Sequence, residues 1–207
     1  MTTSPFSQAA QTWDRRFSEP GFLFGTDPNA YLESWRTLFT SGKRALAVAD
    51  GEGRNSVWLA RQGLAVDAFD ISAVGVAKAR QLAQSASVSV NFSVCDCDGW
   101  SWQAEAYDYV AAIFIQFADP GMRARLFANM VKTLKPGGYL ILQGYTPKQL
   151  EYKTGGPGVP DHLYTEELLR SAFAGLRILD LRAYETVLEE GTRHRGPSAL
   201  IGMVGQR

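Results

Sequence analysis

Acidic and glycine residues that directly follow apolar runs are the features of this sequence that could do chemistry. The segment 50–53 (Asp-Gly-Glu-Gly) follows the apolar run 45–49, Asp70 follows the run 65–69, and Asp96 follows the run 88–94. Glycines let a ligand approach the backbone closely. A carboxylate at Asp70 could accept hydrogen bonds from the two vicinal hydroxyls of a ribose. Together the three positions predict a site for an adenosine-containing molecule.

The elements that must position these residues alternate along the chain. Apolar runs predict strands, and the stretches between them predict helices that begin at Ser72 and at Asp119-Pro120, which are typical of helix N-termini. Strands that alternate with helices indicate a parallel sheet. The predicted strands are 45–49, 65–69, 88–94, 109–115 and 139–142, and the predicted helices are 54–62, 72–86, 120–134 and 165–173.

The end of the chain departs from this alternation. Two strand-like segments, 177–188 and 198–204, are joined by the Gly-containing and charged segment 189–197. Two strands in direct succession predict an antiparallel hairpin. We therefore expect an α/β fold with a mostly parallel seven-stranded sheet that ends in an antiparallel hairpin.

The segment 1–43 is helical in pattern and rich in aromatic residues, and Asp27-Pro28 predicts a second helix start within it. It could cover one edge of the sheet, or it could form a lid over the ligand site. We expect a single domain over residues 1–207, with residues 1–43 as an N-terminal helical lid and residues 44–207 as the core.

Composition narrows the choice of partners. The chain has 21 Lys+Arg and 21 Asp+Glu residues, so it carries neither the basic surface typical of nucleic-acid binding nor a polybasic membrane anchor. The longest apolar run falls well short of the roughly 20 residues that span a bilayer, and residues 1–10 lack the features of a signal peptide. The two cysteines, Cys95 and Cys97, do not make a zinc site. We expect a cytoplasmic monomer or homodimer without a metal.

Several motifs together resemble class I S-adenosylmethionine-dependent methyltransferases, and within them the tellurite-resistance and thiopurine methyltransferase-like branch. The resemblance covers nearly the whole chain and implies a three-layer Rossmann-like methyltransferase fold that uses S-adenosylmethionine to methylate a small molecule. The motifs that carry it are Trp13-Asp14, Phe24-Gly25-Thr26-Asp27-Pro28-Asn29, the segment 50–55, Trp58-Leu59-Ala60, Asp70-Ile71-Ser72, Leu134-Lys135-Pro136-Gly137-Gly138 and the closing hairpin.

The resemblance also implies roles for individual residues. Asp70 would hold the ribose hydroxyls, Ile71 would pack on the adenine, and Asp96 and the backbone N–H of Cys97 would hydrogen-bond the adenine. Two departures stand out, because Ala47 replaces an acidic residue and Ala49 replaces the first loop glycine. Asp50 is our candidate to replace that acid. The expected cofactor-binding residues are Trp13, Asp50, Gly51, Glu52, Gly53, Asn55, Asp70, Ile71, Asp96, Cys97 and Gln116.

The acceptor should lie where the segments 144–164 and 189–197 open on the same edge of the sheet. These segments contain both histidines, His162 and His194, together with Tyr152, and we take these three as candidate catalytic residues. Each histidine could equally be a surface or hydrogen-bonded loop residue. The sequence shows no obvious pair of a base and a residue that orients it.

A soft nucleophile such as a thiolate or a chalcogen species needs little base catalysis, so we expect such an acceptor, methylated by in-line displacement. Two alternatives remain open. A member that binds cofactor or a partner without catalysis would account for Ala47, and an NAD-dependent oxidoreductase would account for Gly51-x-Gly53 followed by Asp70.

Overall fold

The computed structural model describes residues 5–207, so the first four residues of the expected lid and of the segment without signal-peptide features lie outside the described residues. Seven strands form one sheet in the order β3-β2-β1-β4-β5-β7-β6. Strand β7 pairs antiparallel with β5 and β6, and the other pairs are parallel. The strands are β1 Arg44–Val48, β2 Ala65–Asp70, β3 Val90–Val94, β4 Tyr107–Ile113, β5 Leu134–Tyr145, β6 Arg177–Glu190 and β7 His194–Gln206. The predicted sheet and its closing hairpin are confirmed.

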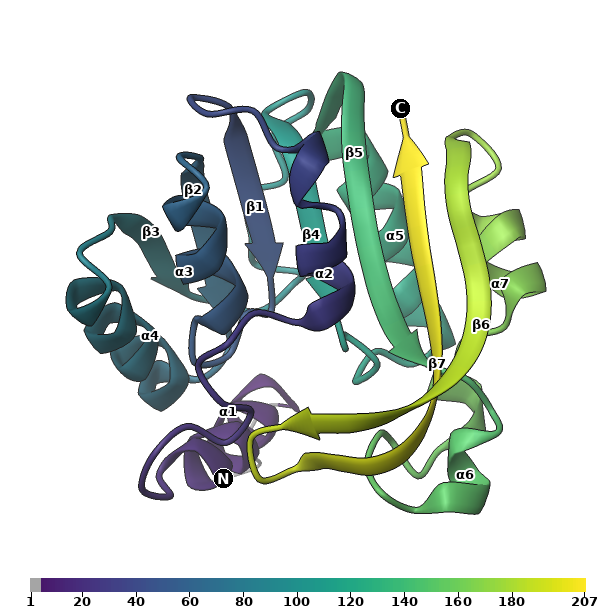
Figure 1. Cartoon of the computed structure of the whole chain (residues 1–207), viewed down its shortest axis with the longest axis horizontal. Helices are drawn as coiled ribbons and strands as arrows, with labels where there is room; N and C mark the ends of the chain where they lie inside the picture. Colours follow the sequence, from purple (N-terminus) through teal and green to yellow (C-terminus); the bar gives the residue numbers. More distant parts are fainter. Residues whose placement is uncertain (1–4) are drawn as a thin grey trace.

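Helices cover both faces of this sheet (Figure 1). Ser72 and Asp119 accept hydrogen bonds from backbone N–H groups at the starts of α4 and α5, as their residue types predict. The helical segments are α1 Pro5–Phe17, α2 Ala30–Ser34, η1 Arg36–Leu38, α3 Arg54–Arg61, α4 Ala73–Ser85, α5 Pro120–Thr133, α6 Gln149–Tyr152, η2 Pro160–His162 and α7 Glu166–Ala172.

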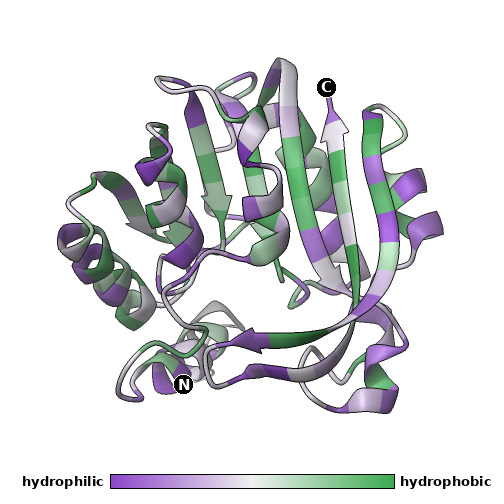
Figure 2. Ribbon diagram, in the orientation of Figure 1, coloured by the Kyte–Doolittle hydropathy of each residue, from purple (hydrophilic) through white to green (hydrophobic). Residues whose placement is uncertain are grey.

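The core is divided by the sheet into two apolar layers. Successive residues of β4 alternate between them, because side chains of a strand point to opposite faces. Val110 packs in the layer that contains residues of α5 and α7, whereas Tyr109 packs in the layer that contains residues of α2 and α3. The central strands are accordingly hydrophobic along most of their length (Figure 2). The result is the expected three-layer arrangement.

Two predicted boundaries are wrong. Asp27-Pro28 does not begin a helix, because Asn29 caps α2 by accepting a hydrogen bond from Leu32 N at 3.1 Å. Strand β5 begins at Leu134 instead of after Gly138, and its pairing with β4 shifts in register between Tyr107 and Tyr109. The segment 135–138, which lies between the predicted helix 120–134 and the predicted strand 139–142, is therefore an irregular part of β5.

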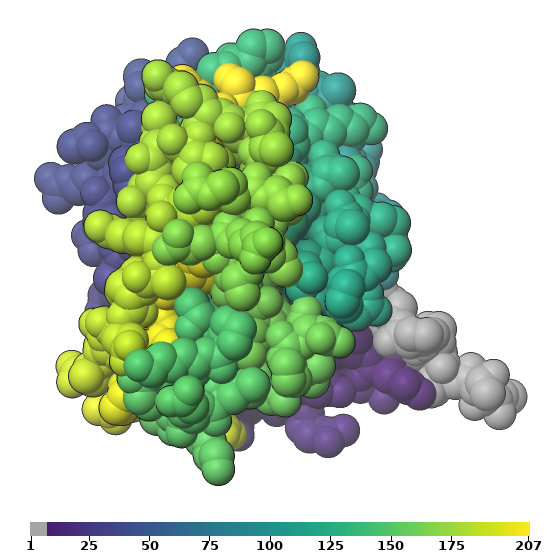
Figure 3. All heavy atoms as spheres, turned by 90° about the vertical axis from the view of Figure 1, so that its right-hand side faces the viewer, coloured from purple at the N-terminus to yellow at the C-terminus, as the bar shows by residue number. Residues whose placement is uncertain are grey.

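The closing hairpin is longer than the sequence indicated. Its strands continue to Glu190 and from His194, so only 191–193 form the turn instead of 189–197. Figure 1 shows the far half of the hairpin bending away from the sheet and crossing below the carboxyl ends of the parallel strands toward α1. Strand β6 is mostly exposed or half-buried, and together with α6 and α7 it forms one side of the molecule (Figure 3).

Candidate functional site

Asp70 joins the ends of β1 and β2 at the carboxyl edge of the sheet. One of its carboxylate oxygens accepts from Gly51 N at 2.9 Å and the other from Ser72 N at 2.8 Å. Burial raises the pKa of Asp70, and these backbone hydrogen bonds oppose that rise. A carboxylate oxygen can accept more than one hydrogen bond. Asp70 can therefore hold the loop in place and still accept hydrogen bonds from a pair of hydroxyls.

Asp50 has an unpaired oxygen inside the protein. Its Oδ1 accepts a hydrogen bond from Ser56 N at 3.3 Å, but its Oδ2 is buried without any partner. Burial raises the pKa of Asp50 to about 7. A buried carboxylate oxygen without a donor is costly, so this atom suits the ammonium group of a ligand. The arrangement fits an amino-acid-bearing cofactor, and the acid that provides it comes three residues after Ala47 in the chain.

Alternate residues of the loop between β1 and α3, namely Ala49, Gly51 and Gly53, have positive φ. Ala49 has φ 48°, in the left-handed region that side chains disfavour. Gly53 has φ 91°, and a Cβ at this position would lie 2.6 Å from the Cβ of Ala79. Gly53 is thus required for close packing of the loop against α4, and its expected place beside a ligand stays a prediction.

Helix α1 lies directly against this loop. The ring of Phe17 is buried and would lie 3.2 Å from a Cβ on Gly51, while Trp13 stacks on Phe17 with ring centroids 5.4 Å apart. Asp14 accepts hydrogen bonds from Ser72 Oγ at 2.5 Å and Val74 N at 3.2 Å at the start of α4. The position of α1 is that of a cover on the candidate cofactor site.

Two residues of the predicted cofactor set are bonded to the segment before α2. Both carboxylate oxygens of Glu52 are used, by Leu23 N at 2.7 Å and by Lys78 Nζ at 2.9 Å. Asn55 Oδ1 accepts from Asn29 N at 2.9 Å. These contacts fix the course of the chain between α1 and α2, so Glu52 and Asn55 position that segment in this structure.

The predicted adenine-facing residues lie in the loop after β3. Asp96 accepts a hydrogen bond from Gly99 N, and the buried Cys97 accepts one through its carbonyl oxygen from Trp102 Nε1 at 2.7 Å. Ile71 is half-buried next to Asp70. The backbone N–H of Cys97 has no hydrogen-bond acceptor among residues 5–207, so it can donate to a ligand.

Gln116 binds other parts of the protein with both ends of its amide. Its Nε2 donates to the carbonyl oxygens of Tyr145 and His162, and its Oε1 accepts from Tyr145 N. His162 Nδ1 lies 3.1 Å from the carbonyl oxygen of Gln116. These two predicted site residues therefore fasten the segment after β4 to the loop before α7.

A buried charged cluster surrounds His194, a candidate from the sequence. His194 Nδ1 lies 3.3 Å from Glu190 Oε2, and the same oxygen accepts from Arg54 Nη2 at 2.8 Å. Burial lowers the pKa of His194, with Arg54 reinforcing and Glu190 opposing this effect. Burial alone would raise the pKa of Glu190, but His194 and Arg54 outweigh it and lower that pKa to about 2. The cluster holds an ionised carboxylate beside a neutral imidazole.

Aromatic rings enclose the imidazole of His194. Ring centroids lie 4.4 Å away for Phe24, 4.5 Å for Phe114 and 5.9 Å for Tyr145. Phe24 also contacts Phe17 at 6.3 Å, so a continuous aromatic wall leads from the Gly51 loop to His194. Phe114, directly after β4, has φ 56°, a strained conformation for a bulky residue and one that clusters at functional sites.

Asn29 and Glu190 are functional candidates that sequence reasoning missed. Asn29 Nδ2 donates to Glu190 Oε1 at 3.1 Å and to Gln143 Oε1 at 2.6 Å. Glu190 faces His194 across the turn in the hairpin register. The predicted joining segment 189–197 was too long, and a turn of 191–193 would have placed Glu190 opposite His194. Tyr152, by contrast, hydrogen-bonds Glu185 on the outer part of β6 and is not part of the cluster.

The tip of the hairpin fastens the segment before α2 over this cluster. Thr192 N donates to Leu23 O at 3.0 Å. A Cβ on Gly191 would lie 2.5 Å from Gly25 N, so the two backbones approach as closely as glycines permit. The hairpin and the segment around Phe24 therefore close one side of the His194 cluster together.

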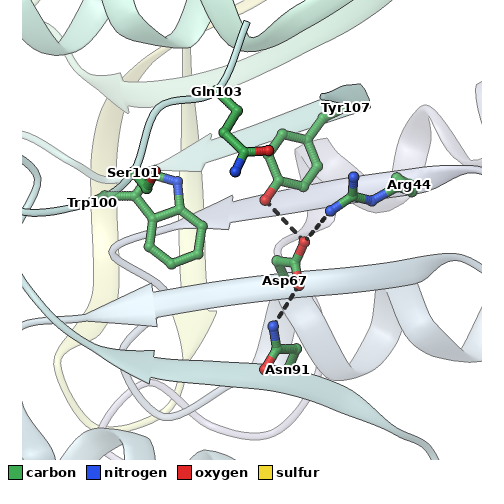
Figure 4. A pocket seen from close by; sticks show the side chains of 7 residues that line it. All are labelled: Arg44, Asp67, Asn91, Trp100, Ser101, Gln103 and Tyr107. Carbon is green, nitrogen blue, oxygen red and sulfur yellow. Dashed lines mark hydrogen bonds and ion pairs between the residues drawn. The ribbon is translucent and has the colours of Figure 1, made fainter. Parts of the chain in front are cut away.

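A separate cavity of about 200 Å³ lies near the amino-terminal ends of β1 and β3, away from the carboxyl edge described above. Figure 4 shows Asp67 at its centre, between Arg44, Tyr107 and Asn91. All three donate hydrogen bonds to the Asp67 carboxylate, at 2.8, 2.9 and 2.8 Å. With these donors in place the carboxylate links three strands, and the cavity contains none of the predicted site residues.

Two further properties concern the described residues only. No helix in residues 5–207 is both long enough and apolar enough to cross a membrane. In the same range no three His, Cys, Asp or Glu side chains gather as metal ligands would.

Comparison with protein families gives one match. Residues 45–138, from β1 to the irregular start of β5, match a family model described as a methyltransferase domain. This range contains Asp50, Asp70 and Asp96 but not His194 or Glu190. A search of curated proteins finds no match.

Solved structures resemble almost the full length of the chain. One, from a study of the conversion of a disulfide bond into a thioacetal group during echinomycin biosynthesis, has a TM-score of 0.75 at 19% identity, covering 96% of this chain and 91% of that one. The N-methyltransferase NodS from Bradyrhizobium japonicum WM9, in complex with S-adenosyl-L-homocysteine, has a TM-score of 0.70 at 15% identity, covering 96% and 97%. TehB from Haemophilus influenzae has a TM-score of 0.70 at 14% identity, covering 96% and 66%. At these identities the likeness concerns the fold.

Proposed function

We propose that the chain is an S-adenosylmethionine-dependent methyltransferase, in line with the methyltransferase-domain match over residues 45–138. We propose further that it methylates a small molecule at a soft nucleophile, a thiol or chalcogen species, by in-line displacement. The observation that carries the proposal is the series of contacting aromatic rings from Phe17 through Phe24 to His194, which connects the segment 50–53 with the end of β4. When bound, the cofactor supplies an electrophilic methyl group on a sulfonium.

The residues of the carboxyl edge divide the binding of the cofactor among them. Asp70 accepts from the ribose hydroxyls, while Asp50 accepts from the amino group through its unpaired Oδ2. The Cys97 backbone N–H and the Asp96 carboxylate serve the adenine. Helix α1 acts as the lid, with Phe17 and Trp13 excluding water from the reacting groups.

Two resemblances support a soft acceptor. The structure from the echinomycin study comes from work on sulfur chemistry, since a disulfide is converted into a thioacetal. TehB shares the fold. On its sequence motifs we place this chain in the tellurite-resistance and thiopurine methyltransferase-like branch. The enclosing rings of Phe24, Phe114 and Tyr145 suit a small apolar acceptor better than a macromolecule. We propose that the enzyme acts as a monomer or homodimer.

Calorimetric titration of the purified chain with S-adenosylhomocysteine, and in parallel with NAD, tests the cofactor site first. Micromolar binding of S-adenosylhomocysteine alone is expected. A screen of thiols and chalcogen oxyanions with S-adenosylmethionine then tests the acceptor class. Binding of NAD alone would contradict the proposal, and cofactor binding without turnover on any acceptor would favour a non-catalytic role. Ala47 is the residue that motivates that second possibility.

A further inference from the structure

We propose that His194 is the general base for the acceptor and that Glu190 orients it. In this arrangement His194 Nε2 takes the proton of a neutral thiol, and Glu190 positions the imidazole. This inference rests on the proposed function and narrows its acceptor from soft nucleophiles in general to a thiol that arrives protonated. A chalcogen oxyanion, which has no proton to lose before attack, would not need such a pair.

The hydrogen-bond pattern leaves one ring nitrogen of His194 available. Nδ1 faces the Glu190 carboxylate at 3.3 Å, and an ionised carboxylate can only accept, so Nδ1 carries the hydrogen. The lone pair is then on Nε2. Nε2 has no hydrogen-bond partner among residues 5–207, and it is not among the fully buried unpaired atoms. A proton from a bound molecule can reach it.

Burial lowers the pKa of His194 and the nearby Arg54 lowers it further, so the imidazole is neutral at physiological pH. A buried carboxylate alone would favour imidazolium, which cannot act as a base. The Arg54 guanidinium binds the same Glu190 oxygen at 2.8 Å, and both side chains are largely buried. The other rings in contact with His194 are uncharged. They are Phe24 from the segment before α2, Phe114 after β4, and the neutral phenol of Tyr145 from β5.

The position of the pair matches its proposed task. His194 contacts both Phe114, directly after β4, and Phe24, which continues through Phe17 to the Gly51 loop. In parallel α/β sheets, ligands lie outside the carboxyl ends of the strands. A small thiol bound against the imidazole of His194 would lie at the same edge of the sheet as the segment 50–53.

The balance of the step is simple. The S–H bond of the thiol breaks and its proton bonds to Nε2, while the sulfur electron pair forms the new S–C bond. The methyl group leaves with the former C–S pair remaining on the cofactor sulfur. The imidazolium, stabilised by Glu190, later releases its proton to solvent, and no further reactant is required.

The test uses His194→Asn, whose amide N–H can still donate to Glu190 but which has no basic nitrogen. Methylation rates are measured with substituted thiophenols and alkyl thiols of graded thiol pKa. A positioned general base contributes roughly 10²–10⁴-fold, so kcat with weakly acidic alkyl thiols should fall by about that factor. Acidic thiophenols, already ionised at pH 7, should lose far less. Equal losses across the series would overturn the inference.

Arg195→Gln is the matched control, since Arg195 is the exposed neighbour of His194 and strand side chains alternate between faces. It should leave the dependence on thiol pKa as in the wild type. Glu190→Gln should lower kcat more than it changes KM and should shift the acidic limb of the pH profile, which a merely structural role would not do.

A second measurement does not depend on turnover. A thiophenol whose thiol pKa is close to 7 is added to the protein saturated with S-adenosylhomocysteine, and thiolate formation is followed by ultraviolet absorbance. At the same pH the bound thiol should be more ionised in the wild type than in His194→Asn, because only the imidazole can take up the proton. Equal ionisation in both proteins would overturn the inference even if methylation proceeds. Absence of methylation of every thiol by the wild type would instead overturn the proposed function, which separates the two failures.

Discussion

The two halves of the candidate site are built in different ways. The cofactor half consists of segments that directly follow strands, and its central bonds run from the Asp70 carboxylate to backbone amides of Gly51 and Ser72. The acceptor half consists of side chains from distant parts of the chain, with Arg54 and His194 meeting on Glu190. A site made from a local backbone motif can therefore be predicted from a sequence, whereas one made from converging side chains cannot.

Asp70→Ala should have the largest effect, which should be a loss of affinity in the cofactor half of the site alone. Each charge-assisted hydrogen bond lost costs ~1.5–3 kcal/mol, which is about 10–150-fold in affinity. Calorimetric titration with S-adenosylhomocysteine should therefore find no detectable binding. Thr165→Ala, at the distant start of α7, should bind normally. Unchanged affinity in Asp70→Ala would show that the ribose assignment is wrong.

Glu190→Ala should destabilise the acceptor half. Arg54 would remain as a buried cation without its partner, which costs about 3–5 kcal/mol. Denaturant unfolding measures this loss. Glu185→Ala is the matched control on the same strand, because its ion pair with Lys148 is about half exposed and such pairs contribute about 0–1 kcal/mol. Similar losses in both variants would contradict a special role for the buried cluster.

Asp50→Asn should stabilise the ligand-free protein while weakening cofactor binding. The pKa of Asp50 is about 7, above its ordinary 3.8, so the folded state binds the proton more tightly. Wild-type stability should therefore fall as pH rises from about 4 to 7, and each pKa unit amounts to about 1.4 kcal/mol. Thermal unfolding should show a gain of a few kcal/mol for the variant above pH 7. The gain should vanish near pH 4, and a gain independent of pH would refute the explanation.

Ala49→Gly should have the smallest effect, a stabilisation of up to about 1 kcal/mol. Glycine relieves the left-handed φ of 48°, although its greater freedom in the unfolded chain offsets part of the gain. Ala47→Gly, in the buried interior of β1, should instead destabilise by about 0.5–1 kcal/mol. Chemical denaturation of both variants provides the measurement, and a loss of stability in Ala49→Gly would mean that the loop is not strained there.

Local signals predicted much of the fold and failed where a distant contact decided. Ser72 and Asp119 cap helices because their side chains reach amides only three residues away. Asp27-Pro28 carried the same local signal, but Asn29 became the cap, and its side chain is also held by Gln143 and Glu190 from other strands. Partners 114 and 161 positions away leave no mark on the local pattern.

The sequence by itself determined the succession of strands and helices along the chain, the loop from Asp50 to Gly53 and the position of Asp70 at a strand end. These features depend on backbone conformation and on neighbours close along the chain. Only the tertiary structure decided that the hairpin bends across the carboxyl edge, that Glu52 and Asn55 hold the segment before α2, and that Glu190 joins His194 to Arg54. The physical reason is that a buried charge is costly unless it is paired with another group. Which partner lies within reach depends on the packing of the whole chain.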